Sequence, residues 1–222
     1  MKLKKVNEAL ASFSPSLPLE ARYMITLTRQ PVFIDTVLPL PRTKVLEVAR
    51  DIILVLSFSL LTALSARVSF WIGPVPITGQ TLAVLLAGIL LGSIRGGLSQ
   101  VVYLLVGLTG FPFWFAAGGP LGMARLLGPT GGYLIGFVFA AFLIGWLAER
   151  GWDKKIKTAI SAMLIGNIVI YIFGLFWLAN FIPLKGLLAA GLYPFIPGDA
   201  LKTLLAGLIL PMGWKIIQRS SN

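Results

Sequence analysis

An acidic and a basic residue lie three positions apart in the last apolar segment of the chain. The segment reads IPGDALKTLLAGLILPMGW, so Asp199 and Lys202 fall on one face of a helix. A charge inside a membrane segment costs about 2.5–3.5 kcal/mol on insertion scales, and such residues usually face a pocket or pathway. The pair therefore indicates a binding site for a polar small molecule. The alternative is structural, because aspartate is a favoured cap after Pro197-Gly198 and a lysine can extend to the membrane interface.

Arg125 is the third charged residue expected at this site. It lies in the loop between the third and fourth apolar segments, which we place at the same membrane face as the start of the sixth. Arg125, Asp199 and Lys202 together carry a net charge of +1, which one carboxylate would neutralise. Arginine can hold a carboxylate with two parallel hydrogen bonds, and aspartate can accept N–H donors of an amide or urea. The alternative is an ion triad that closes the outer loops.

Hydroxyl and amide side chains precede the second apolar segment. The stretch PVPITGQTLAVLLAG brings Thr78, Gln80 and Thr81 near the same outer face. We take Thr78 and Gln80 as candidate ligand contacts. The alternative is that they cap the helix that follows.

Aromatic residues supply candidate walls for a ring-bearing ligand. The loop Gly110–Gly132, which contains Trp114, is rich in glycine and aromatic residues, and glycine lets the backbone approach a ligand closely. Tyr171 and Trp177 lie towards the outer end of the fifth segment. The alternative for these residues is the aromatic belt that collects at lipid interfaces.

The composition is that of a membrane protein. Of the 222 residues 57% are hydrophobic and 12% are charged, whereas soluble domains carry about 25% charged residues. The net charge of +11 does not indicate nucleic-acid binding, because the basic residues cluster between apolar runs and at the ends of the chain. We therefore expect the lipid bilayer to be the solvent of this protein and no nucleic-acid partner.

Several kinds of chemistry have no residues to carry them. The chain has no cysteine and no histidine, which excludes thiol nucleophiles and imidazole metal ligands. We find no Walker loop, acidic metal cluster or paired carboxylates of a membrane hydrolase. We therefore expect no enzymatic activity, no metal and no cofactor, and any ATP-driven work has to come from partner subunits.

Six apolar segments follow a mixed N-terminal stretch. Their length and continuous apolarity predict an all-α, polytopic membrane protein with six transmembrane helices rather than barrel strands. We divide the chain into an extension at 1–48, on the cytoplasmic side or the membrane surface, and a transmembrane domain at 49–222. The expected segments are Ile52–Trp71, Ile77–Ile94, Gly97–Gly110, Gly131–Ala148, Ile156–Ile182 and Asp199–Ile217.

The distribution of lysine and arginine predicts the orientation. With a cytoplasmic N-terminus the inner flanks from residue 42 onward carry ten basic residues, and the outer loops carry only Arg67, Arg125 and Lys185. Basic residues accumulate on the cytoplasmic side of membrane proteins. Both termini should therefore be cytoplasmic in a prokaryotic cell membrane, with the candidate site at the outer face.

Four motifs in order resemble the BioY family, the biotin-binding S components of energy-coupling factor (ECF) transporters. They are PVPITGQTLAVLLAG, LLGPTGGYLIGF, IYIFGLFWL and IPGDALKTLLAG, and the resemblance covers about residues 50–217. It implies a six-helix S component that captures biotin outside and releases it inside. The family's charged binding positions correspond to Arg125, Asp199 and Lys202. A polar residue of the family's third-to-fourth loop has no clear counterpart, since Phe113–Gly119 is apolar here.

The resemblance also implies partners. The family's S components join a transmembrane T component and two cytoplasmic ATPases, which hydrolyse the ATP. The small-residue face by which the first helix of S components often docks, AxxxA, appears here as Ser59-xxx-Ala63. Membrane lipids are expected neighbours, and a homo-oligomer is a further option.

Three other functions compete with biotin uptake. The first is an S component for another vitamin, such as thiamine or riboflavin. The second is a membrane enzyme acting on a lipid or acyl substrate, against which the missing histidine, cysteine and paired carboxylates argue. The third is an assembly subunit of the membrane that binds no ligand.

Overall fold

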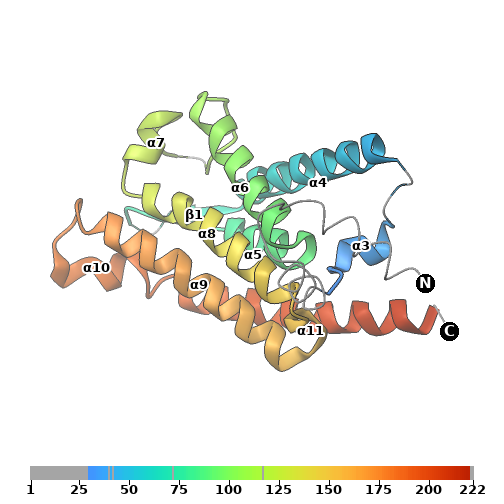
Figure 1. The fold of residues 1–222 in the computed structure, drawn as a ribbon. Coiled ribbons are helices and arrows are strands. Elements are labelled where there is room, and N and C mark those ends of the chain that lie inside the picture. Colours follow the sequence, from blue (N-terminus) through green and yellow to red (C-terminus); the bar gives the residue numbers. More distant parts are fainter. Residues whose placement is uncertain (1–29, 40, 42, 72, 117, 221–222) are drawn as a thin grey trace, which may run out of the picture.

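The computed structural model describes the chain except residues 1–29, 40, 42, 72, 117 and 221–222. The described residues form a bundle of helices with one short hairpin (Figure 1). In chain order the elements are α3 (Phe33–Val37), α4 (Lys44–Ser65), β1 (Ser69–Trp71), β2 (Pro76–Thr78), α5 (Gln80–Leu91), α6 (Ser93–Leu108), α7 (Met123–Leu127), α8 (Gly131–Ala148), η1 (Trp152–Lys154), α9 (Ile156–Leu178), α10 (Leu184–Gly191) and α11 (Ile196–Ser220).

The six apolar segments expected from the sequence correspond to α4, α5, α6, α8, α9 and α11, which confirms the predicted fold class. Within the part of the chain that the structure describes, four helical stretches are long and apolar enough to cross a membrane: α4, α8, α9 and the run Leu184–Ile217 through α10 and α11. Helices α5 and α6 are shorter, with 12 and 16 residues. The chain is therefore a multi-pass membrane protein with a bundle of unequal helices.

The predicted bounds of the first helix were wrong at both ends. Helix α4 already begins at Lys44, where the Thr43 hydroxyl accepts a hydrogen bond from the Leu46 N–H, and it ends at Ser65. The predicted division between residues 48 and 49 thus falls inside a continuous helix. The segment expected to end at Trp71 instead enters β1, which pairs antiparallel with β2. Residues 1–29 of the predicted extension lie outside the described residues.

Close backbone contacts let α8 pack in the middle of the bundle, against α5, α6 and α9. A Cβ on Gly88 of α5 would lie 2.4 Å from the Ala141 carbonyl oxygen of α8, and one on Gly145 would lie 2.2 Å from the Gly92 backbone. Small residues at such crossings are typical of membrane helix packing. These small residues hold the inner surfaces of α5, α8 and α9 close together, so the middle of the bundle is tightly packed.

The predicted docking pair on α4 faces the interior of the bundle. Ser59 and Ala63 are 1% and 4% exposed, so neither lies on the surface of the isolated chain. The outward face of α4 carries apolar side chains such as Val45, Ile53 and Leu64. If α4 docks against a partner, these outward residues would form the contact.

The polar features of the bundle gather at its two ends. Figure 1 places the hairpin, α7 and α10 at one end, and α3, the start of α4 and the end of α11 at the other. We call these the hairpin end and the clamp end. The candidate site lies at the hairpin end.

Candidate binding site

Six of the eight ligand-contacting residues predicted from the sequence line one cavity at the hairpin end. The cavity contains about 540 Å³ of empty space, its opening to solvent included. Polar side chains from five elements contribute to its wall: Thr78 from β2, Gln80 from α5, Arg125 from α7, Tyr171 from α9, and Asp199 and Lys202 from α11. Residues distant in sequence thus meet in one place, at the one end of the bundle where the sequence analysis expected them.

The carboxylate of Asp199 is the centre of the polar wall. Its Oδ1 accepts hydrogen bonds from the Thr81 hydroxyl at 2.9 Å and from Lys202 Nζ at 3.0 Å, and its Oδ2 accepts one from the Tyr171 hydroxyl. The Asp199 residue is only 6% exposed. A buried carboxylate that accepts three hydrogen bonds has a fixed orientation, because a buried charge is tolerated only with partners.

Lys202 forms hydrogen bonds to the same polar wall. Its ammonium donates to the Thr78 carbonyl oxygen and to the Thr81 hydroxyl, both at 2.8 Å. Thr81 therefore bridges the acid and the base. This residue was near the predicted site but was not among the predicted contacts. Its position next to Gln80, in the same stretch PVPITGQT that contains Thr78, was the available signal.

The local sequence explains why these groups converge. Helix α11 begins at Ile196, so Asp199 lies in its first turn, where a negative charge is favoured by the exposed N–H groups. Gly79 separates β2 from α5, and a Cβ there would lie 2.9 Å from the Ser65 carbonyl oxygen. Glycine thus lets the hairpin pass close to the end of α4 and directs Thr78 and Thr81 to α11.

Arg125 is buried beneath a glycine-containing loop. Its side chain belongs to α7, the residue is 3% exposed, and its Nη2 donates to the Ala116 carbonyl oxygen at 3.2 Å. A Cβ on Gly119 would lie 1.5 Å from Arg125 Nη1, so glycine at this position leaves room for the guanidinium where it lies. Burial lowers the pKa of Arg125, and Tyr103 offsets part of this effect. The group nevertheless remains a cation, as arginine does in proteins.

A second cavity adjoins the first at Arg125 and Thr130, which line both. Its other lining residues are glycines and prolines of the neighbouring loops, including Gly118, Gly119 and Pro129. An anionic group in either space would lie next to this cation.

The predicted tryptophan walls are not on the cavity. Trp114 donates its indole N–H to the Tyr103 carbonyl oxygen at 2.8 Å and stacks on that tyrosine. Trp177 donates to the Gly128 carbonyl oxygen at 2.9 Å. Both indoles are thus used to brace loops. The apolar walls are instead formed by residues that the sequence did not single out, among them Phe115, Tyr133, Leu134, Phe137, Ile170 and Phe195.

Gln80 is oriented by a partner inside the protein. Its amide donates to the buried Tyr103 hydroxyl at 2.5 Å, and the residue itself is 4% exposed. The cavity thus combines apolar walls with a few fixed polar groups, which is typical of small-molecule sites. Within the described residues, no group of three or more potential metal ligands is present.

Comparison with known proteins identifies the family. The sequence model of the BioY family matches residues 36–219. A probable biotin transporter BioY of Pyrococcus horikoshii is 40% identical over 161 residues, which cover 72% of this chain and 94% of that protein. A biotin transporter BioY of Rhizobium etli is 36% identical over 171 residues, covering 72% and 90%.

A solved structure has the same architecture. The crystal structure of the S-component for biotin from an ECF-type ABC transporter superposes with a TM-score of 0.66 at 30% sequence identity. The match covers 79% of this chain and 95% of that one. The sequence motifs, the helical bundle and these comparisons agree, and the chain belongs to the BioY family, a family of transporter components and not of enzymes.

Proposed function

We propose that this chain is the biotin-binding membrane subunit, the S component, of an ECF-type ABC importer. One observation carries the proposal: Arg125, Asp199 and Lys202 line one apolar-walled cavity. Their net charge of +1 suits a ligand with one carboxylate. The names of the relatives, biotin transporter BioY, and the solved S-component for biotin point to the same ligand.

The chemistry of biotin matches the cavity group by group. Its ureido ring offers two N–H donors, which suit the Asp199 carboxylate, and its bicyclic ring is apolar and suits walls such as Phe195. Its valerate tail ends in a carboxylate, which suits Arg125 or Lys202.

The charge of the cavity also separates biotin from the other vitamins considered. Thiamine is a cation, and a site of net charge +1 disfavours it by like-charge repulsion. Riboflavin has no carboxylate for Arg125. The site charge therefore favours biotin within the S-component class, and a subunit without any ligand leaves the buried Asp199 and Arg125 unexplained.

The partners and orientation follow from the same proposal. A T component and two ATPase subunits would supply the assembly and the ATP hydrolysis, and this chain would need no cofactor of its own. The ten basic residues on the inner flanks support cytoplasmic termini and an outward hairpin end in a prokaryotic cell membrane. Biotin would then be captured at the outer face and released inside.

Calorimetry of biotin binding to the purified protein in detergent tests the proposal. We expect tight one-to-one binding, weakened in Arg125→Ala, Asp199→Ala and Lys202→Ala. Truncating one partner of a buried, hydrogen-bonded charge pair costs about 2–5 kcal/mol, so each loss should be about thirtyfold or more. The matched control is Lys185→Ala, which removes an exposed lysine of α10.

Two results would overturn the proposal. One is the absence of biotin binding by well-folded wild-type protein, after which thiamine and riboflavin would be screened. The other is unchanged affinity in all three site variants, which would place the ligand elsewhere. Biotin methyl ester serves as a second probe, because it lacks the charge that Arg125 or Lys202 would bind.

A further inference from the structure

A short segment closes the end of the bundle opposite the cavity. Residues 30–37, which we call the clamp, comprise an extended stretch and α3 (Figure 1). A five-residue helix is far too short to be stable alone in water. Its conformation therefore depends on its contacts with α4, α6, α8 and α11.

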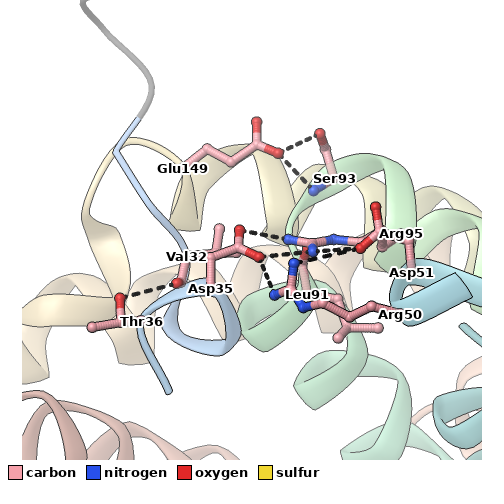
Figure 2. A network of polar contacts seen from close by, with 9 residues as sticks. All are labelled: Val32, Asp35, Thr36, Arg50, Asp51, Leu91, Ser93, Arg95 and Glu149. Carbon is pink, nitrogen blue, oxygen red and sulfur yellow. Dashed lines mark hydrogen bonds and ion pairs between the residues drawn. The ribbon is translucent and has the colours of Figure 1, made fainter. Parts of the chain in front are cut away.

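Asp35 makes the central contact of the clamp. Its two carboxylate oxygens accept hydrogen bonds from Arg95 of α6, from Nη1 at 2.8 Å and Nη2 at 2.7 Å. Oδ1 also accepts one from Arg50 Nη2 of α4 at 2.5 Å. Figure 2 shows the carboxylate facing both guanidinium groups. Asp35 of α3 thus joins α4 and α6 through Arg50 and Arg95, which are 45 residues apart in the sequence.

The charges balance only when the clamp is in place. Asp51 pairs with Arg95 at 3.0 Å, so the cluster of Asp35, Arg50, Asp51 and Arg95 is neutral. The Arg50 and Arg95 side chains are only 10% and 15% exposed, whereas Asp51 is 38% exposed. Among the described residues, Arg50 Nε has no hydrogen-bond partner. Without Asp35, two largely buried arginines would face each other with one exposed acid between them.

Apolar and backbone contacts seat the clamp on both sides of Asp35. Val32 is 3% exposed, and a Cβ on Gly92 would lie 3.3 Å from its side chain. Phe33 packs edge-on against Trp214 of α11, with ring centroids 5.5 Å apart. The Gln30 N–H donates to the Glu149 carbonyl oxygen at 2.7 Å. The clamp is therefore held by contacts with the Gly92 turn, the end of α8 and α11 as well as by Asp35.

The geometry points to a specific role for residues 30–37: they are a clamp that fixes the start of α4 to the bundle, and Asp35 makes its central contact. The match to the family begins at residue 36, so Asp35 lies just before the shared region. No residue of the clamp lines the cavity, whose polar side chains belong to β2, α5, α7, α9 and α11. The inference therefore goes beyond the proposed function and does not rest on it.

Cysteine labelling tests the clamp, because the chain contains no cysteine of its own. Val32→Cys places one thiol on the buried side of the clamp, and Val37→Cys places one on its exposed side, at a residue that is 48% exposed. Both are reacted with a maleimide in detergent. We expect Val32→Cys to react slowly and Val37→Cys rapidly. Adding Asp35→Asn should accelerate labelling at position 32 by about tenfold or more, since it leaves a buried charge pair broken.

Asp51→Asn is the matched control. It removes the same charge from the same cluster, but Asp51 is the more exposed acid and lies on α4 rather than on the clamp. Labelling at position 32 should change by less than about threefold, as for a surface ion pair. If Asp35→Asn does not yield monodisperse protein, Asp35→Glu keeps the charge but shifts the carboxylate, and should still accelerate labelling.

Two outcomes would overturn the inference. The first is labelling of Val32→Cys as fast as Val37→Cys in the otherwise unchanged chain, which would mean that the segment is not seated. The second is equal labelling at position 32 with Asp35 intact, replaced by asparagine or replaced by glutamate. Biotin binding should be unchanged in Asp35→Asn, which separates loss of the clamp from loss of the site.

Discussion

Thr81→Val removes a single oxygen from the centre of the candidate site. The Thr81 hydroxyl donates to Asp199 Oδ1 at 2.9 Å and accepts from Lys202 Nζ at 2.8 Å. Valine has nearly the same shape, so the cavity wall should keep its form. Asp199 and Lys202 retain each other at 3.0 Å but lose the group that fixes both.

The magnitude follows from the two lost hydrogen bonds. Bonds to charged groups contribute about 1.5–3 kcal/mol each, and the remaining contacts of Asp199 and Lys202 compensate for part of the loss. We expect a total near the cost of one such bond, which corresponds to a decrease in biotin affinity of about 10- to 150-fold. Calorimetry gives the affinity, and thermal unfolding in detergent shows that the variant is folded.

Thr109→Val is the matched control for this prediction. Thr109 is exposed, lies outside the cavity, and its hydroxyl donates to the Val106 carbonyl oxygen at 2.7 Å. The same substitution there should lower the affinity by less than about threefold, because it removes one exposed neutral hydrogen bond. Equal affinities of Thr81→Val and wild type, or equal losses in both variants, would refute the assigned role of Thr81.

Three further predictions concern other parts of the chain. Gly119→Ala should displace the Arg125 side chain, because a Cβ would lie 1.5 Å from Nη1, and should weaken biotin binding in calorimetry while leaving the thermal unfolding temperature nearly unchanged. Gly145→Ala should instead lower that temperature, because the Cβ would meet backbone atoms 2.2 Å away, and overpacking costs about 1–3 kcal/mol. Burial alone would raise the pKa of Asp35, but Arg95 and Arg50 bring it below the usual 3.8. Its contribution to stability is then complete above that pH and lost as the pH falls through the folded-state pKa, so the difference in unfolding temperature between wild type and Asp35→Asn should shrink between about pH 5 and pH 3.

The sequence predicted the membrane helices best where glycine and proline frame them. The bounds of α8, Gly131–Ala148, are those expected, because Pro129 and the double glycine mark its start. The start of α4 was missed because its first turns, KVLEVAR, are charged and look like part of the polar extension. A helix that passes from a polar flank into lipid cannot be delimited by hydropathy alone.

The charged residues of the site could be predicted from the sequence, because their position among the apolar segments indicated a common membrane face. Charges are rare in this chain, so Arg125, Asp199 and Lys202 stood out, and the structure places all three on one cavity. The roles of Trp114 and Trp177 were not predictable, because each indole is held by a backbone carbonyl that no motif reveals. Choosing between a ligand wall and a loop brace requires knowing where those carbonyls point.

The contacts of Asp35 were beyond the reach of the sequence for another reason. Its partner Arg95 lies 60 residues away, and α3 has too few residues to show a period. Ion pairs between such distant elements depend on how the whole bundle assembles. The N-terminal stretch therefore looked like an unassigned extension, although its last residues belong to the folded domain.

The uneven charge at the mouth of the cavity has an electrical consequence. An empty site carries +1, whereas a site holding a monocarboxylate is neutral. Moving one elementary charge through a membrane potential of 100 mV involves about 2.3 kcal/mol of work, and moving a neutral complex involves none. If the loaded site changes sides of the bilayer, the voltage across the membrane would neither drive nor oppose that step. The return of the empty site would be the voltage-sensitive half of the cycle.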